Sequence, residues 1–392
     1  MHIPQLKTFI SFFAFSLVMH HNIHLWWRYF PQRELTHIYV SSAVRSFALS
    51  LVGLFIPLYL YKELGFSLEE TLGFFIFYSV IFAVSTPVAA KFSARYGVKH
   101  AVLVSSPFYL AFLVLLYVLP NFDTSLLLIA AFLGLSQSFY WVGMHVVFFH
   151  ASDHRHRGEE VGKRMAVSIL STVLGPLLGG AFIMWFGFRI VFFLSSLLLV
   201  FSALVLFLSK EEHVRYHFSV RSVLNKEHWR NSLFFVSQGC RVIADGVIWP
   251  LFVFVVLDNY FSLGVVGSLL AGISAVLIWL VGKYSDHYEK RKIILFVTPL
   301  ESVSWWARAL ATSVGGIFGA TIFGALTHGI REAPLGAMEY DKAKGDITAY
   351  FVSREIFICL GRILLLMVVL MTHSLAGGLV FQGIVNSASL LF

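Results

Sequence analysis

Long apolar stretches alternate with short polar breaks along the chain from about residue 35 to its end. Segments 101–119 and 190–209, for example, contain no charged residue. Each is about as long as the roughly 20 residues that a helix needs to cross the hydrocarbon core of a bilayer. A helix satisfies its own backbone hydrogen bonds in lipid, and the segments are too long and lack the alternation of barrel strands. The pattern predicts an all-α polytopic membrane protein.

The polar breaks predict twelve spans, six in each half of the chain. The predicted spans are 35–62, 69–90, 101–120, 125–150, 164–186, 188–209, 232–257, 263–282, 293–313, 316–338, 347–371 and 376–392. We expect an N-terminal six-helix bundle at 35–209 and a C-terminal six-helix bundle at 232–392, joined by a cytoplasmic linker at 210–231. Residues 1–34 mix His, Trp and Arg as an interfacial helix does, with a cleaved signal sequence as the alternative.

The composition fits the membrane class. Of the 392 residues, 58% are hydrophobic and 40 are Phe, and the mean hydropathy is +0.79, which is more than a soluble core can use. Lys and Arg gather in the N-terminal segment and in the loops after even-numbered spans. Because basic residues oppose translocation, this predicts cytoplasmic N- and C-termini, with the bacterial inner membrane as the expected location. The net charge of +8 is then a topology signal that needs no nucleic-acid partner.

The two halves of the chain resemble each other. Pro57 recurs as Pro250, and the Phe-Ser-Leu triplet at 66–68 recurs at 261–263. Both separations are close to half the chain, and six predicted helices lie between the copies, so the copies have the same orientation. Two parallel halves about an axis normal to the membrane are one of the repeat arrangements of secondary transporters.

The loop at 281–292, after the second helix of the second half, is unusually rich in charge. It resembles the cytoplasmic motif of the major facilitator superfamily, which recurs more weakly after span two. The matching positions are Gly282, Asp286, Lys290 and Arg291 in this loop, and Arg95, Gly97 and Lys99 in the first half. The resemblance implies a latch in which Asp286 caps a neighbouring helix and pairs with basic residues. A solvated basic loop that only sets the topology is the alternative.

Span five resembles a motif of the exporter branch of that family. The motif spacing is matched by Gly162, Gly175, Pro176, Gly179 and Gly180, with Ser171 in place of one glycine. Small residues at such intervals let two helices approach closely, and proline bends the helix axis. Ordinary helix packing, with no export function, is the alternative interpretation.

Ionisable groups inside the spans are the candidate functional residues, because burying one costs about 2.5–3.5 kcal/mol even on the insertion scale. The resemblance implies that helices one, four, seven and ten line a central cavity. The polar and aromatic candidates on these helices are Arg45, Gln137, Tyr140, Trp141, His145, Gln238, Arg241, Asp245, Trp249, His328, Arg331 and Glu332. We expect Arg241 and Asp245, four residues apart, to neutralise each other. Ion pairs between helices that only hold the bundle together are the alternative.

Other charges fit a cavity less well. Glu301 and Arg308 of span nine favour structural pairing, whereas Arg354, Glu355 and Arg362 of span eleven either pair with span ten or shuttle a proton. His145 is a titratable candidate because imidazole changes charge near neutral pH. The proton-coupled exporters of the family usually have an arginine in helix four, which this chain lacks.

The loop histidines do not predict a metal site, because the spacing of His150, Asp153, His154 and His156 is loose. No P-loop, HExxH or GxSxG pattern is present, so we expect neither an ATP-driven pump nor an enzyme, and no cofactor.

The leading hypothesis is a monomeric secondary transporter in the lipid bilayer. It would export a small organic solute by alternating access, with protons as the candidate coupling ion. An importer of a nutrient or organic anion, with Arg45, Arg241 and Arg331 as the anion site, is the alternative within the class. A membrane scaffold or receptor that does not transport is the alternative from another class.

Overall fold

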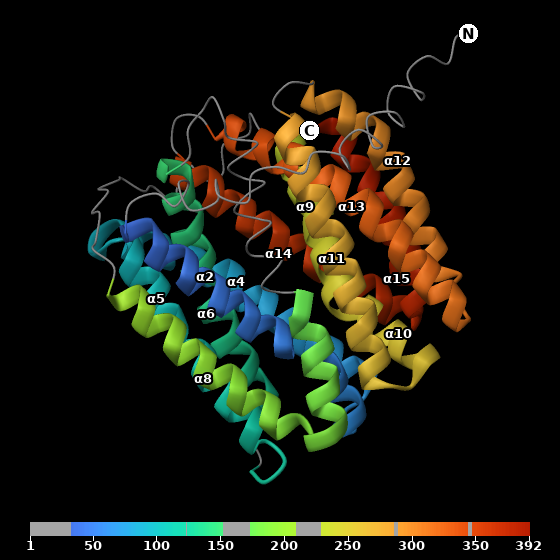
Figure 1. Ribbon diagram of the computed structural model, residues 1–392, viewed down its shortest axis with the longest axis horizontal. Coiled ribbons are helices and arrows are strands. Elements are labelled where there is room, and N and C mark those ends of the chain that lie inside the picture. The colour runs from blue at the N-terminus through green and yellow to red at the C-terminus, as the bar shows by residue number, and fades with distance from the viewer. Residues whose placement is uncertain (1–32, 123, 152–172, 209–228, 286–288, 344–346) are drawn as a thin grey trace, which may run out of the picture.

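The computed structural model describes residues 33–122, 124–151, 173–208, 229–285, 289–343 and 347–392 (Figure 1). Helices joined by short turns make up these residues, and no strand occurs among them. The prediction of an all-α fold is confirmed.

The helices follow the predicted spans. Their bounds are α2 (Arg33–Gly53), α3 (Ile56–Leu58), η2 (Tyr59–Glu63), α4 (Leu68–Tyr96), α5 (Val98–Val118), α6 (Leu126–Ala151), a helix at Val173–Phe186, α8 (Phe188–Phe207), α9 (Trp229–Ile243), η5 (Ala244–Ile248), α10 (Trp249–Leu257), α11 (Tyr260–Ser285), α12 (Lys290–Ala309), α13 (Val314–Lys342), α14 (Ile347–Thr372), α15 (Leu375–Val385) and η6 (Asn386–Leu391). The elements α2, α3 and η2 form the first span, α9, η5 and α10 the seventh, and α15 with η6 the twelfth.

The predicted and observed ends differ by a few residues. The largest difference at a described end is in span two, where α4 continues to Tyr96 instead of ending at 90. The first nine residues of the predicted span 164–186 lie outside the described residues, as do the linker at 210–228 and the segment 1–32. The domain boundaries that we expect in those segments therefore stay predictions.

Most of the helices can cross a membrane by length and composition. Among the described residues, eight helices are long and apolar enough, and Val173–Phe186 and Leu375–Leu391 are apolar but shorter. The helices α12 and α13 are as long but more polar, because they carry ionisable side chains in their interiors. Those side chains are buried or partly buried in the contacts described below, which is how such groups are tolerated within a membrane.

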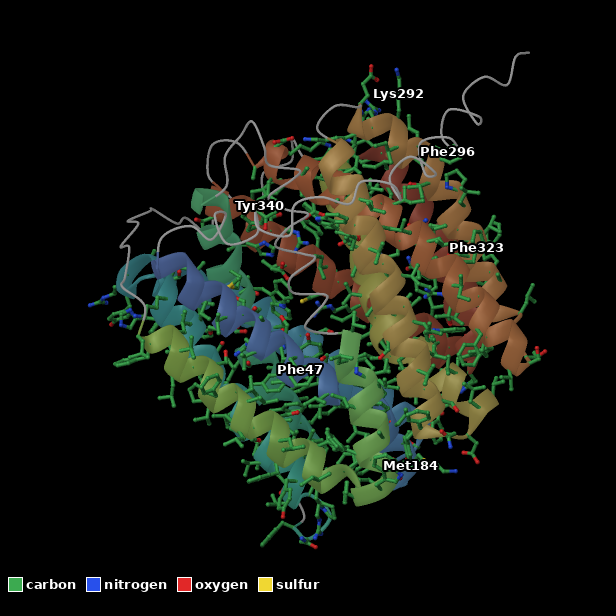
Figure 2. All side chains as sticks on the ribbon, in the orientation of Figure 1. Phe47, Met184, Lys292, Phe296, Phe323 and Tyr340 are labelled. Carbon is green, nitrogen blue, oxygen red and sulfur yellow. The ribbon has the colours of Figure 1, made fainter. Side chains whose placement is uncertain are left out.

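The outer surface of the bundle is apolar. Large side chains such as Phe296 and Met184 project outward (Figure 2), and Phe296 is 73% exposed. An apolar surface of this extent marks contact with a membrane or a partner. Together with the length of the helices, it fits a chain whose surface faces lipid.

Short turns with defined caps end the helices. Ser67 begins α4 with a capping box, in which its hydroxyl accepts from the Glu70 amide while the Glu70 carboxylate accepts from the Ser67 amide. Gly97 separates α4 from α5 with φ = 98°, a conformation that glycine adopts without steric cost. The motif glycine after span two is therefore needed by the backbone itself.

The helices gather in two groups in Figure 1. Most blue-to-green helices of the first half lie on one side and most yellow-to-red helices of the second half on the other, with α14 running between them. The first helix of each half contains a π-helical segment beside its proline, η2 next to Pro57 and η5 next to Pro250. Proline lacks the N–H that continues the α-helical ladder, so a local change of helix type is expected there. The repeat seen in the sequence thus has a counterpart in the backbone.

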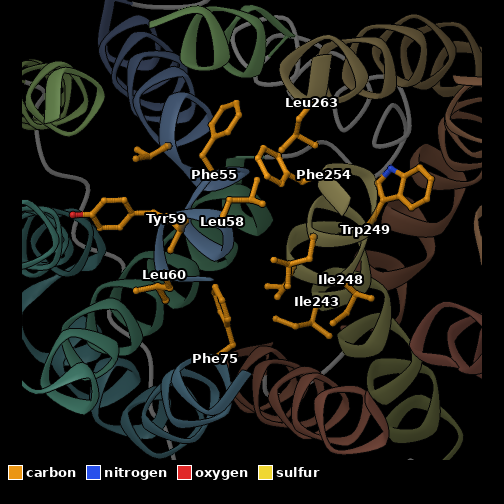
Figure 3. Packing of buried hydrophobic residues seen from close by; sticks show 14 of the residues in the cluster. Phe55, Leu58, Tyr59, Leu60, Phe75, Ile243, Ile248, Trp249, Phe254 and Leu263 are labelled. Carbon is orange, nitrogen blue, oxygen red and sulfur yellow. The ribbon is translucent and has the colours of Figure 1, made fainter. Parts of the chain in front are cut away.

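The two halves meet at both ends of the bundle. We call the end with the turns at 64–67, 258–259 and 373–374 the odd-loop end, and the end with Gly97 and Ala343 the even-loop end. Between the ends, one continuous hydrophobic core contains residues of both halves, and Figure 3 shows part of it. Within a bilayer such packing works through van der Waals contact, because lipid is as apolar as the core.

Glycines bring helices of the two halves into backbone contact. A Cβ atom on Gly180 would lie 2.5 Å from the carbonyl oxygen of Tyr260, and one on Gly264 would lie 2.4 Å from the carbonyl oxygen of Pro176. The helix at Val173–Phe186 and α11 therefore touch without room for a methyl group. This is the close approach that small residues permit in membranes.

Candidate functional site

A cluster of buried and partly buried ion pairs lies in the second half. At its centre Arg331 of α13 is 0% exposed, and its Nη1 lies 2.7 Å from Oε2 of Glu301 on α12. The same nitrogen donates to Oδ1 of Asn386 at 3.0 Å, and Nη2 donates to Oε1 of Gln238 at 3.4 Å. Arg331 therefore joins α13 to α12, η6 and α9.

Arg241 of α9 forms the second centre of the cluster. Its Nη2 lies 3.3 Å from Oε2 of Glu332, and its Nε donates to Oε1 of Gln238 at 3.0 Å. Its Nη1 lies 2.9 Å from Nδ1 of His328. A guanidinium only donates, so Nδ1 accepts, and this hydrogen bond assigns the proton of the neutral ring to Nε2.

Asp245 pairs with Arg308 of α12, whose Nη1 donates to Oδ1 at 2.7 Å. The guanidinium of Arg308 also lies over the ring of Trp305, 4.2 Å from its centroid, and at 5.3 Å from that of Trp249. A cation over an indole face is stabilised by the ring quadrupole. Arg308 is therefore held by one carboxylate and two tryptophans.

The expected pairing of Arg241 with Asp245 is wrong. Arg241 pairs with Glu332 and Asp245 with Arg308, so each partner comes from another helix. The reason lies in the backbone, because α9 ends at Ile243 and Asp245 belongs to the π-helical η5. A π turn contains more residues than an α turn, so a spacing of four no longer places two side chains one above the other.

The structural pairing expected for Glu301 with Arg308 takes a different form. Each residue pairs across to another helix, Glu301 with Arg331 and Arg308 with Asp245. Span nine therefore neutralises charges of α13 and η5 instead of its own.

A second polar cluster joins the two halves at the even-loop end. His145 of α6 is 6% exposed, with Nδ1 3.1 Å from Oη of Tyr340 on α13 and Nε2 3.2 Å from Oε1 of Glu355 on α14. Its ring stacks on Phe351 with centroids 4.6 Å apart and planes 2° apart. Tyr340 lies near this end of the bundle in Figure 2. His145 thus joins α6 to both α13 and α14.

Arg354 completes this cluster. Its Nε donates to Oε2 of Glu339 at 2.8 Å, and its Nη1 contacts Glu355 and lies 3.3 Å from Nε2 of His145. The sequence suggested that the charges of span eleven pair with span ten. Arg354 does pair with a carboxylate of α13, but this carboxylate is Glu339 and not Glu332. Glu339 and Tyr340 are functional candidates that the sequence missed, because the predicted end of span ten at 338 lies just before them.

Arg45 lies apart from both clusters, buried in the first half. It is 3% exposed, Nη1 donates to Oγ of Ser106 at 3.2 Å, and the guanidinium lies 4.2 Å from the ring centroid of Tyr140. On α6, Gln137 accepts a 3.0 Å hydrogen bond from the indole of Trp141. Of the five predicted positions of helices one and four, His145 belongs to the second cluster and Trp141 stacks on it with centroids 5.7 Å apart, whereas Arg45, Gln137 and Tyr140 lie outside both clusters.

Arg362 of α14 reaches into the first half. Its Nη1 donates to Oη of Tyr78 on α4 at 2.8 Å, and it lies 5.0 Å from the ring centroid of Phe82. Tyr78 was not a candidate, because a neutral aromatic residue in an apolar span gives no sequence signal of its own.

The described part of the latch motif makes contacts within each half. Lys290 donates to Oδ2 of Asp341 at 3.1 Å, and Lys99 donates to the carbonyl oxygen of Phe207 at 3.0 Å. Arg95 lies over the ring of Tyr96, and Arg291 is exposed. Asp286 lies outside the described residues, so the latch stays a prediction. The side chains of the loop candidates His150, Asp153, His154 and His156 also lie outside them.

The helix-five motif lies where three helices meet. A Cβ atom on Gly179 would lie 2.3 Å from the carbonyl oxygen of Leu51, and one on Gly175 would lie 1.8 Å from Oγ of Ser50. Gly180 and Pro176 face α11, as described above. Gly162 lies outside the described residues. The described glycines of the motif thus pack this helix against α2 and α11.

A groove on the outer surface, with a volume of about 510 Å³, is a different feature. Its lining includes Leu113, Tyr117, Phe186 and Arg189, from α5, the fifth span and α8. It contains none of the candidate residues, and its largely apolar walls suit contact with lipid.

Comparisons with known proteins agree on one family. The model of the Major Facilitator Superfamily matches residues 38–366 of this chain. The chain is 23% identical over 351 residues to the uncharacterized protein YqgE of Bacillus subtilis, covering 84% of this chain and 80% of that protein. It is 27% identical over 287 residues to the multidrug resistance protein MdtG of Citrobacter koseri, covering 67% and 69% of the two chains.

Solved structures show the same fold. The fucose:proton symporter FucP of E. coli superposes with a TM-score of 0.66 at 11% identity, covering 91% of this chain and 97% of that one. The human organic anion transporter MFSD10 superposes with a TM-score of 0.65 at 11% identity, covering 92% and 99%. The helices, the repeated halves and the match over residues 38–366 agree, and the chain belongs to the Major Facilitator Superfamily.

Proposed function

We propose that the protein is a secondary transporter that exports a small organic solute by alternating access between its two halves. The similarity to proteins named for multidrug resistance and the spacing of the helix-five motif favour export. We propose that it is a monomer of the bacterial inner membrane, and the distribution of Lys and Arg favours cytoplasmic termini.

The observation that carries this proposal is that polar side chains join the halves at each end of the bundle, in addition to the apolar and backbone contacts described above. At the odd-loop end Tyr260 donates to Oε1 of Glu63 at 2.5 Å, and Lys62 lies 3.7 Å from Asp258. At the even-loop end the contacts of His145 join the halves. Exposed ion pairs of this kind are worth about 0–1 kcal/mol, so the contacts at the odd-loop end can break and re-form as the halves rock.

Cross-linking at each end tests the proposal. In a background with Cys240→Ala and Cys359→Ala, the pairs Lys62→Cys with Asp258→Cys and His145→Cys with Tyr340→Cys should each be joined by a thiol-reactive cross-linker whose spacer contains a reducible disulfide, because the contacts are between the tips of long side chains. We expect each cross-link to stop solute movement in proteoliposomes loaded with aromatic cations, anions and neutral solutes, and a reductant to restore it for the odd-loop pair. The single-cysteine variants control for the substitutions. A protein that moves none of the solutes, or transports equally well when cross-linked, would support a scaffold instead.

We further propose that protons couple to transport at His145. Its Nε2 faces a donor, Nη1 of Arg354 at 3.3 Å, and an acceptor, Oε1 of Glu355 at 3.2 Å. An unprotonated Nε2 can accept only from Arg354, and a protonated one can donate only to Glu355. Protonation of Nε2 therefore determines whether His145 of α6 accepts from Arg354 or donates to Glu355 of α14. In this way protonation affects the contact between the halves.

Glu355→Gln is expected to separate exchange from accumulation. The variant should still exchange internal for external solute, because exchange needs no net proton movement. Its accumulation of solute driven by a pH gradient should be at least about tenfold lower than that of the wild type, because the neutral amide cannot pair with the imidazolium as the carboxylate does. Glu69→Gln, an exposed carboxylate at the odd-loop end, is the control. Unchanged pH-driven accumulation in Glu355→Gln would exclude this coupling site.

A further inference from the structure

The charges buried in the spans balance in one half and not in the other. In the described residues of the second half, the arginines inside spans are equalled in number by carboxylates, and all but Arg362, which donates to Tyr78, form an ion pair with one. These residues are Arg241, Arg308, Arg331, Arg354 and Arg362, and Asp245, Glu301, Glu332, Glu339 and Glu355. In the described residues of the first half, Arg45 is the one buried arginine, and no lysine or carboxylate there is buried with it.

Arg45 uses little of its hydrogen-bonding capacity. A guanidinium has five N–H donors, and the contact of Nη1 with Ser106 accounts for one of them. Its Nε and Nη2 are buried and have no hydrogen-bond partner among the described residues. The rings of Tyr140 and Tyr109, at 4.2 and 5.9 Å, stabilise its charge without satisfying these donors. An unsatisfied buried donor is costly, and more so on a charged group.

The two unused nitrogens have a particular geometry. The N–H groups of Nε and Nη2 point the same way along one edge of the planar guanidinium. Two parallel N–H groups match the two oxygens of a carboxylate, which is the pairing that makes arginine selective for such anions. The other arginines inside spans in the described residues differ, because Arg241, Arg308, Arg331 and Arg354 each pair with a carboxylate and Arg362 donates to the hydroxyl of Tyr78.

We infer that Arg45 binds the anionic group of an organic substrate, a carboxylate or a comparable anion with two oxygens in one plane. This inference deepens the proposed transport function and rests on it. It replaces the three-arginine anion site expected from the sequence, because Arg241 and Arg331 are already neutralised by Glu332 and Glu301. Since Arg45 is 3% exposed, the anion reaches it only when the surrounding helices part.

The stability of the empty protein distinguishes a binding role from a structural one. If Arg45 is an anion-binding group that has no anionic partner in the empty protein, Arg45→Gln removes an uncompensated buried charge. The melting temperature in detergent should then stay equal or rise. If Arg45 holds the fold together, the same substitution should lower the melting temperature, and that result would overturn the inference. Arg189→Gln, which removes an exposed arginine of α8, is the matched control.

Ligand binding is tested with 1-naphthoate, its neutral amide 1-naphthamide, and 1-naphthylmethylamine as the cation. We expect 1-naphthoate alone to raise the melting temperature of the wild type. Its apparent affinity should fall about tenfold or more in Arg45→Gln, the loss of one charge-assisted pair, and less in Arg45→Lys, which keeps the charge but not the fork. Stabilisation by 1-naphthoate that persists unchanged in Arg45→Gln contradicts the inference.

The same proteins in liposomes separate this inference from the proposed function. Binding of 1-naphthoate through Arg45 without movement of any solute across the membrane would leave the anion site standing and refute transport. Transport of the amine or amide at wild-type rates in Arg45→Gln, without any effect of 1-naphthoate on the wild type, would leave transport standing and refute the anion site.

Discussion

Arg331→Met is expected to destabilise the folded protein by about 3–5 kcal/mol, which is the cost of leaving one member of a buried ion pair unpaired. The variant strands Glu301, which is 2% exposed and lies 2.7 Å from the guanidinium. It also removes the hydrogen bonds that join α13 to Asn386 and Gln238. The measurement is a titration with a denaturing detergent, followed by tryptophan fluorescence.

The double variant Arg331→Met with Glu301→Met should regain most of this loss, because neither charge then remains in the low-dielectric interior. Arg291→Met, at the exposed start of α12, controls for removal of a cation and should change stability by no more than about 0.5 kcal/mol. If the losses of the two single variants simply add in the double variant, the pair does not contribute as a unit.

Gly239→Ala is expected to produce the second large loss of stability. A Cβ atom there would lie 1.9 Å from the carbonyl oxygen of Ile358 on α14, and one on Gly361 would lie 2.0 Å from the carbonyl oxygen of Val236 on α9. Both obstacles are backbone atoms, so the two helices must separate to admit a methyl group. Overpacking of this kind typically costs about 1–3 kcal/mol, and a contact this short puts the variant at the upper end.

Gly319→Ala is the matched control for this substitution. A Cβ atom at Gly319 of α13 would meet nothing within 4 Å. Alanine is favoured over glycine inside a helix by about 1 kcal/mol, so this variant should be as stable as the wild type or slightly more stable. Equal melting temperatures for Gly239→Ala and Gly319→Ala would mean that α9 and α14 are not in the backbone contact described above.

The positions of the helices could be predicted from the sequence because the bilayer imposes a length on each apolar segment. The predicted span 188–209 coincides with α8, and 347–371 with α14, to within two residues. The residues that carry buried charge could also be named, since an ionisable side chain in an apolar segment is conspicuous whatever its partner. Arg45, Arg308 and Arg331 are examples.

The partners of those charges could not be predicted, because they depend on how helices far apart in the chain face one another. His145 meets Glu355, 210 residues later, and Arg331 meets Glu301 on a helix that no sequence pattern places beside it. The pairing of Asp245 was missed for a local reason, the π-helical η5, which no periodicity argument includes. The absence of a carboxylate beside Arg45, among the described residues, becomes visible only in three dimensions.

The unequal distribution of buried charge has an electrical consequence. Moving one elementary charge through a membrane potential of 100 mV involves about 2.3 kcal/mol, whereas a neutral pair moving as a unit involves almost none. The matched arginines and carboxylates of the second half therefore make its displacement nearly independent of voltage. Arg45 gives α2 an uncompensated charge, and an anion bound there would cancel it. The conformational change of the empty carrier is therefore expected to depend on the membrane potential. The conformational change of the carrier loaded with an anion is expected to be nearly independent of it.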